Sequence, residues 1–194
     1  MTPAAPPASV RRLDLPSAAE LAGLAAVFED LQYALRCCEH LVIALGAREP
    51  DAAQVEALWT GALIAYVRCF SPRGAVLTEA DLAGLEHEDE FRRLHGMLSR
   101  ARDQLASRHV NPREAFTIGV AQDADGKPTG IAVVSSPRPL VEEPTVRMLG
   151  RLAYNLAGRV DARMQERQRQ VLDEAAALAP AELARLPLVH LTVA

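Results

Sequence analysis

The feature that most constrains the fold is an apolar stripe between residues 21 and 45, whose members recur at alternating steps of three and four. This spacing places every member on one side of an α-helix and is typical of helix–helix packing. The stripe consists of Leu21, Leu24, Phe28, Leu31, Leu35, Cys38, Val42 and Leu45. Ser17 with Glu20 predicts a capping box at the start of the helix, and Gly46 predicts its end. The stripe packs either within a bundle or against a second copy of the chain.

Helical patterns dominate the rest of the chain, with one exception. Further helices are predicted to begin near residues 51, 78 and 86 and to span about 145–178 and 180–186. A content of 49% apolar but only 4% aromatic residues suits helices. Between them, Phe116, Ile118 and Val120 alternate with small residues and precede an Asp-Gly turn and a second apolar run. The sequence therefore predicts a mainly α fold, a helical bundle with one β-hairpin at about 115–135.

The length of 194 residues fits a single domain with a full core. Residues 1–16 are rich in proline and alanine, and we expect them to form a disordered tail that does not pack. Residues 17–194 are expected to form one helical domain that includes the hairpin. Residues 188–193 are apolar enough to add a strand.

Composition excludes several functional classes. The net charge of −4 gives no general basic field for nucleic acids, and Lys127 is the only lysine. Cys37, Cys38 and Cys69 form no disulfide framework, and five scattered histidines without clustered carboxylates predict neither a metal site nor a cofactor. No apolar run approaches the ~20 residues of a membrane span. We therefore expect a cytoplasmic protein that does not bind a membrane.

Candidate functional residues gather on the predicted helix at residues 86–111. Two stripes with seven-residue spacing run along it. The apolar stripe consists of Phe91, Leu98 and Leu105, and the polar stripe consists of His95, Arg102 and His109. Because seven residues are nearly two helical turns, each stripe lies on one face. An arginine between two histidines on a half-buried face is costly unless an anionic or polar group meets it, so this face is the best candidate for a binding or catalytic site.

The segment from Arg102 to His109 resembles the R-x4-6-H motif of the HEPN superfamily (higher eukaryotes and prokaryotes nucleotide-binding domains). Asp103 matches the polar residue that often follows the arginine. The segment 66–70, with Tyr66 and Phe70, matches an aromatic-Arg-x-Phe pattern found in bacterial HEPN-like proteins. The layout of residues 17–178, with a hairpin and a long helix after the motif, is also similar to that of these proteins.

The resemblance implies a small helical bundle that acts as a metal-independent endoribonuclease in a toxin–antitoxin or phage-defence system. A homodimer would bring two copies of Arg102 and His109 into one cleft. His109 would transfer a proton to or from RNA, and Arg102 would bind the phosphate. Asp103 would orient a neighbouring group, and His95 is a candidate for a second acid or base. The apolar stripe at residues 21–45 and the polar stripe of His95, Arg102 and His109 both exceed what one small bundle buries easily, which also favours a homodimer.

Two alternatives remain open on the sequence alone. In the first alternative, both residues are purely structural: Arg102 pairs with an acidic side chain of another helix, and His109 caps the helix end. In the second alternative, the chain is HEPN-like but not catalytic and acts as a protein–protein interaction or structural module. A catalytic site requires that Arg102 and His109 are reachable from solvent, whereas an interaction module is expected to expose an apolar surface.

Overall fold

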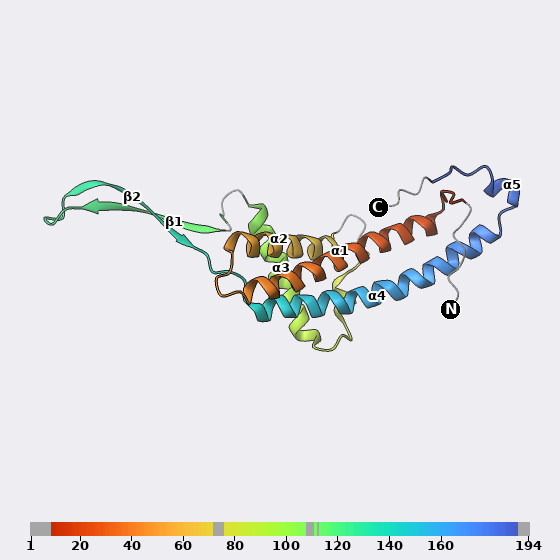
Figure 1. Ribbon diagram of the computed structural model, residues 1–194, viewed down its shortest axis with the longest axis horizontal. Helices are drawn as coiled ribbons and strands as arrows, with labels where there is room; N and C mark the ends of the chain where they lie inside the picture. Colours follow the sequence, from red (N-terminus) through yellow and green to blue (C-terminus); the bar gives the residue numbers. More distant parts are fainter. Residues whose placement is uncertain (1–8, 72–75, 108–110, 112, 190–194) are drawn as a thin grey trace. The chain divides into compact units, whose positions relative to one another are not determined.

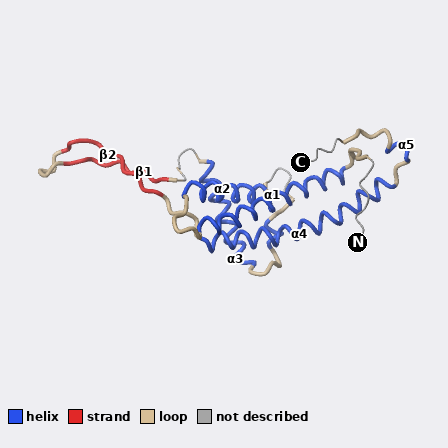
Figure 2. Tube along the Cα trace, viewed as in Figure 1, coloured by secondary structure: helices blue, strands red, loops and turns tan. Residues whose placement is uncertain are grey.

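The computed structural model describes residues 9–71, 76–107, 111 and 113–189, and within them the chain is mainly helical (Figures 1 and 2). The elements in chain order are α1 (Pro16–Leu45), α2 (Ala52–Arg68), the 3-10 helix η1 (Glu79–Leu82), α3 (Glu88–Ala106), β1 (Glu114–Gln122), β2 (Pro128–Pro137), α4 (Glu143–Ala176) and α5 (Pro180–Leu183). The strands form one antiparallel hairpin. This confirms the predicted fold class, a helical bundle with a β-hairpin.

The described residues group into two compact units, where the sequence predicted a single domain. The first comprises residues 9–29 and 157–189, and the second comprises residues 30–156. Helices α1 and α4 contribute to both units, because each is long enough to continue from one into the other.

In the first unit, the start of α1 packs antiparallel to the end of α4. Ser17 donates a hydrogen bond to Glu174, and Arg167 pairs with Glu20 at 2.8 Å. Leu24 and Val27 are buried here together with Val160 and Val171 of α4. Because α1 begins at Pro16, Ser17 lies inside the helix. The capping box predicted from Ser17 and Glu20 was therefore wrong, since both side chains contact α4.

A short backbone pairing also orders the first unit. Arg11 and Leu188 form an antiparallel bridge, with Arg12 N bonded to Pro187 O and Val189 N bonded to Val10 O, each at 2.9 Å. The sequence predicted that residues 1–16 do not pack and that residues 188–193 can add a strand. In the described part, residues 10–12 differ from the first expectation, because backbone groups can pair whatever the side chains are. Residues 1–8 and 190–194 lie outside the described residues.

In the second unit, α1, α2, α3 and α4 share an apolar core. Its largest fully buried side chains are Leu31, Leu41, Tyr66, Leu63, Leu77, Leu82, Leu98, Leu149, Leu152 and Leu156. Glycines allow helices to approach α1: a Cβ at Gly61 would lie 3.3 Å from the hydroxyl of Tyr33, and one at Gly150 would lie 3.5 Å from Cβ of Cys38. The packing of the unit therefore depends on small residues as well as large ones.

The buried stripe of α1 is rotated from the predicted one. Leu24, Leu31 and Cys38 are buried as predicted, but Phe28 and Leu35 are only half-buried. Their place is taken by the residues one position earlier, Val27 and Ala34. Alanine and valine fill close helix contacts that a pattern based on leucine overlooks. The stripe therefore packs largely within the chain and gives little support to a dimer formed through α1.

Local hydrogen bonds set the ends of the shorter elements. The side chain of Asp51 caps α2 by accepting bonds from Ala53 N at 2.9 Å and Gln54 N at 3.3 Å. The side chain of Asp81 accepts a bond from Thr78 N at 2.7 Å, which forms a capping box at the start of η1, where a helix was predicted to begin near residue 78. The starts of both helices could be predicted from the sequence because capping depends on residues within three positions of each other.

Helix α3 is shorter than predicted. The pattern at residues 86–111 was expected to remain helical throughout, but α3 ends at Ala106 and Ser107 is extended. The N–H of Ser107 bonds to the carbonyl of Gln104, three residues back, which tightens the last turn and stops the α-helical ladder. The apolar stripe of α3 also fades toward this end, since Phe91 and Leu98 are buried but Leu105 is half-buried.

Candidate functional site

The end of α3 carries a half-exposed ion pair between neighbouring residues. Arg102 donates from Nε at 2.9 Å and from Nη2 at 2.7 Å to the same oxygen, Oδ1 of Asp103. The side chains are 43% and 67% exposed. An exposed ion pair of this kind contributes no more than ~1 kcal/mol to stability. A phosphate that replaces Asp103 would therefore compete with a weak contact.

The structure does not bring all members of the polar stripe together. α3 ends at Ala106, and His109 lies outside the described residues. His95 lies seven residues before Arg102, about 10 Å along the helix axis. Among the described candidates, Arg102 and Asp103 are in contact, and His95 belongs to a different cluster.

His95 is buried, with only 8% of its surface exposed. Its Nδ1 lies 2.9 Å from the hydroxyl of the fully buried Tyr66. Its ring lies 4.5 Å from that of Phe70 and 5.9 Å from that of Tyr66, measured between centroids. Tyr66 lies in the last turn of α2 and Phe70 lies just beyond the C-cap Cys69, so the C-terminal end of this helix holds the imidazole. We call these three residues the His95 cluster.

One acidic residue faces the other ring nitrogen of His95. Oε1 of Glu79, at the start of η1, lies 4.0 Å from Nε2, and the Glu79 side chain is 75% exposed. Burial lowers the pKa of His95, and the charge of Glu79 opposes this effect in part. Burial also raises the pKa of Tyr66, which keeps its hydroxyl protonated. Tyr66 can thus donate to Nδ1, while the N–H at Nε2 faces Glu79.

This arrangement favours a structural role for His95 over the predicted acid–base role. At neutral pH the lowered pKa keeps the ring uncharged, as burial beside two aromatic rings requires. Both ring nitrogens already face a protein group. A substrate would have to displace Glu79 to reach Nε2. The His95 cluster therefore suits positioning of α3 on α2 better than proton transfer.

Sequence reasoning identified some of these partners and missed one. Tyr66 and Phe70 were noted through the aromatic-Arg-x-Phe pattern, and their four-residue spacing is what places both on His95. The arginine of that pattern, Arg68, instead faces Asp30 at 3.4 Å. Glu79 was missed, and its only signal was its place in the first turn of η1.

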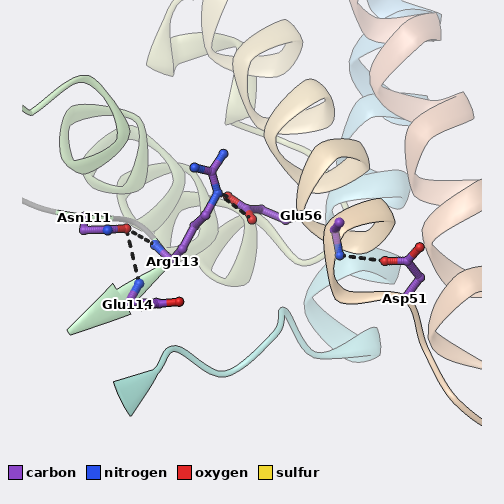
Figure 3. Close-up of polar contacts among 6 residues, drawn as sticks. Asp51, Glu56, Asn111, Arg113 and Glu114 are labelled. Carbon is purple, nitrogen blue, oxygen red and sulfur yellow. Dashed lines mark hydrogen bonds and ion pairs between the residues drawn. The ribbon is translucent and has the colours of Figure 1, made fainter. Parts of the chain in front are cut away.

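A second set of contacts fixes the start of β1, beyond the segment that contains His109. Oδ1 of Asn111 accepts bonds from Arg113 N at 2.8 Å and Glu114 N at 3.2 Å. Nε of Arg113 lies 2.7 Å from Oε1 of Glu56 on α2, as Figure 3 shows. The chain is therefore anchored on both sides of His109, by the end of α3 before it and by the contact with α2 after it.

The remaining chemistry of the described residues is limited. Within these residues, no three His, Cys, Asp or Glu side chains lie close enough to hold a metal ion. Cys37, Cys38 and Cys69 are buried thiols. Burial raises the pKa of Cys38 and that of Cys69 to about 12, which makes these two thiols poor nucleophiles. No helix in the described part of the chain has the length and hydrophobicity to cross a bilayer.

Comparisons with protein-family models, curated proteins and solved structures found no match to this chain. The resemblance to HEPN proteins therefore stays a prediction from the sequence motif and the predicted layout. The local geometry of Arg102 and of the His95 cluster is the basis for any statement about function.

Proposed function

We propose that this chain is a HEPN-like, metal-independent endoribonuclease of a bacterial toxin–antitoxin or phage-defence system. The observation that carries the proposal is the environment of Arg102. Its side chain is 43% exposed and its described ion pair is with its own neighbour on α3, Asp103. The structural alternative required an acidic partner on another helix. A pair between adjacent exposed residues joins no two elements, so stability gives little reason for an arginine at this position.

In the proposed mechanism, Arg102 binds the scissile phosphate through two parallel N–H groups. His109 accepts the proton of the ribose 2′-hydroxyl, whose oxygen attacks phosphorus as the bond to the 5′-oxygen breaks. The proton then passes to the departing 5′-oxygen. The products are a 2′,3′-cyclic phosphate and a 5′-hydroxyl end. Arg102 stabilises the charge that develops on the phosphoryl oxygens.

Asp103 would hold the guanidinium until RNA arrives. Both of its bonds to Arg102 use one carboxylate oxygen, Oδ1, and orient the side chain from the end of α3. The His95 cluster would support the site indirectly by fixing α3 against α2. In this scheme a change at Asp103 alters RNA binding, whereas a change in the His95 cluster alters stability.

The proposal is tested with the purified full chain and a single-stranded RNA in the presence of chelator. Wild-type protein should cleave and leave 2′,3′-cyclic phosphate ends. Arg102→Ala and His109→Ala should each reduce the rate by about 10²-fold or more, the scale of losing a charge clamp or a general acid–base. Arg100→Ala, which removes an exposed arginine from the same helix, is the matched control and should retain activity. Equal cleavage by wild-type and His109→Ala proteins would refute the proposal.

A non-catalytic interaction module is the second candidate, because the hairpin exposes large apolar side chains. Phe116, Ile118 and Ile131 are 55%, 64% and 71% exposed. An apolar surface of this kind is typical of a binding site for another protein chain. Absence of cleavage by every protein in the RNA experiment, together with a complex formed through the hairpin, would favour this second function.

A further inference from the structure

Two arginines face each other at the base of the hairpin. The pairing of Glu114 with Pro137 ends the ladder, and one position further out the N–H of Arg138 bonds to the carbonyl of Arg113 at 2.8 Å. Arg113 and Arg138 are therefore directly opposite each other, and opposite residues of an antiparallel pair share a face. Two like charges in this position repel each other. We call these two residues the arginine pair.

Only one of the two guanidinium groups has an acidic partner among the described residues. Nε of Arg113 lies 2.7 Å and 2.9 Å from the two carboxylate oxygens of Glu56. The terminal nitrogens of Arg113 point away from Glu56 in Figure 3. The exposed side chain of Arg138 forms no ion pair with the described part of the chain. The arginine pair thus sets two positive charges against one carboxylate and keeps N–H donors on both residues for an anion.

The local structure keeps the neighbouring carboxylate away from the arginine pair. Glu114 follows Arg113 in the chain and lies on the opposite face, because successive residues of a strand alternate between faces. On that face, Oε2 of Glu114 accepts a hydrogen bond from Ser135 at 2.6 Å. Oδ1 of Asn111 accepts bonds from the backbone N–H groups of both Arg113 and Glu114, at 2.8 Å and 3.2 Å. These bonds fix the backbone from which the two charged side chains project to opposite sides.

The arginine pair is reachable from solvent. The side chain of Arg113 is 70% exposed, and Arg138 is exposed as well. The next pair on the same face consists of Ala115 and Ser136, whose side chains are short and exposed. A guanidinium group extends well beyond such side chains. An anion can therefore contact both arginines without displacing any of these neighbours.

We propose that the arginine pair binds the phosphodiester backbone of RNA next to the chain segment that contains His109. A guanidinium binds a phosphate through two parallel N–H groups, and two on one face can hold one phosphate together or two consecutive ones. Arg113 follows His109 by four residues, so their Cα atoms are at most ~14 Å apart. The identity of the anion as RNA rests on the proposed function, whereas the excess of positive charge does not.

The other end of the hairpin argues against a membrane as the anionic partner. Asp123 and Asp125 with Lys127 give the tip a net negative charge. A flat anionic bilayer along this face of the hairpin would meet the tip as well as the base, and the tip would be repelled. An RNA strand can cross the base alone, beside α2, where Glu56 holds Arg113.

The salt dependence of RNA binding tests whether the arginine pair contacts phosphate. The probe is a fluorescent single-stranded 2′-O-methyl RNA, which cannot be cleaved, and its binding to the full chain is followed by anisotropy. Each phosphate contact contributes about 0.7 to the slope of log K against log salt for a single strand. Arg138→Gln should lower the magnitude of the slope by about 0.7 and raise the Kd about tenfold, as loss of a hydrogen bond to a charged group does. Adding Arg113→Gln should double the change in slope.

Lys127→Gln is the matched control, because it removes one positive charge from the other end of the same hairpin. Its slope and Kd should equal those of the wild-type protein. Thermal unfolding should be the same for wild-type and Arg138→Gln proteins, because the Arg138 side chain forms no ion pair with a described residue. Equal slopes for wild-type and Arg138→Gln proteins, or an equal change in Lys127→Gln, would overturn the proposal. Weaker binding of Arg138→Gln to phosphatidylserine vesicles, with RNA binding intact, would also overturn it.

Cleavage of an unmodified RNA separates this proposal from the proposed ribonuclease function. Arg138→Gln should raise KM about tenfold and leave kcat unchanged, because a contact distant from the scissile bond holds substrate and transition state equally. Binding through the arginine pair without cleavage by the wild-type protein would contradict only the enzyme. Cleavage by the wild-type protein, with equal KM values and equal salt slopes for Arg138→Gln, would contradict only the arginine pair.

Discussion

The two halves of α3 carry the same sequence pattern in opposite environments. In the first half, Leu98 and His95 are 0% and 8% exposed, and His95 bonds to a buried tyrosine. In the second half, seven residues later in each case, Leu105 is half-buried and the Arg102 side chain is 43% exposed. The heptad repeat thus continues along the helix, but α2 and η1 cover only its beginning.

Under the proposed function, this difference separates stability from RNA binding along one helix. In the covered half, the buried imidazole of His95 has a hydrogen-bond partner within the protein, the hydroxyl of Tyr66, as a buried polar group requires. The open half holds a cation whose only described ion pair is with the exposed Asp103. Changes in the first half should therefore act on the free energy of unfolding, and changes in the second half should act on RNA.

Leu98→Ala and Leu105→Ala compare the two halves through the apolar stripe, with the largest expected effect on stability. Leu98 is fully buried, so its truncation should lower the free energy of unfolding by about 2–5 kcal/mol. Leu105→Ala should cost clearly less, because solvent already reaches that side chain. Urea unfolding measures both. Similar losses would mean that α3 is covered along its whole length.

Tyr66→Phe and Asp103→Asn compare the two polar contacts. Removal of the Tyr66 hydroxyl leaves Nδ1 of the buried His95 without its donor and should cost about 1–3 kcal/mol. Asp103→Asn breaks an exposed ion pair and should change stability by less than ~1 kcal/mol. Thermal unfolding of the two variants gives the contrast. A greater loss for Asp103→Asn would reverse the assignment of the two halves.

The pH dependence of stability should come in part from the first half. The pKa of His95 is lowered in the folded state, so the unfolded chain binds its proton more readily. The associated stability is fully present above the ordinary histidine pKa near 6.5 and is lost as the pH falls from there toward the folded value. His95→Gln should reduce this loss between about pH 7.5 and 5.5. His87→Gln, which alters an exposed histidine, should not.

Much of the fold could be predicted because its signals are local. The capping residues Asp51 and Asp81 act within three positions, and the alternation around Ile118 needs no knowledge of the rest of the chain. The end of α3 was predicted too late in the chain. Asn111 precedes Pro112, and this pair marks only the last position that the helix could reach. The buried stripe of α1 was misplaced because Ala34 is a core residue only where a neighbouring helix approaches closely.

The candidate site was less predictable because it depends on contacts between elements. The sequence placed His95 and Arg102 on one face, which is correct for helical spacing but says nothing of what covers each position. Tyr66 and Glu79 reach His95 from α2 and η1, 29 and 16 residues earlier in the chain. The burial that sets the pKa of His95 therefore arises only after the helices pack.

The most direct test of the division along α3 is nuclear magnetic resonance with a bound RNA that cannot be cleaved. A 2′-O-methyl oligonucleotide lacks the attacking hydroxyl, and its phosphates can still meet an exposed guanidinium. Titration should shift the Nε–H signal of Arg102 in the wild-type protein and leave the imidazole signals of His95 unchanged. A shift at His95 with none at Arg102 would contradict the account, because it would place the RNA on the covered half of the helix.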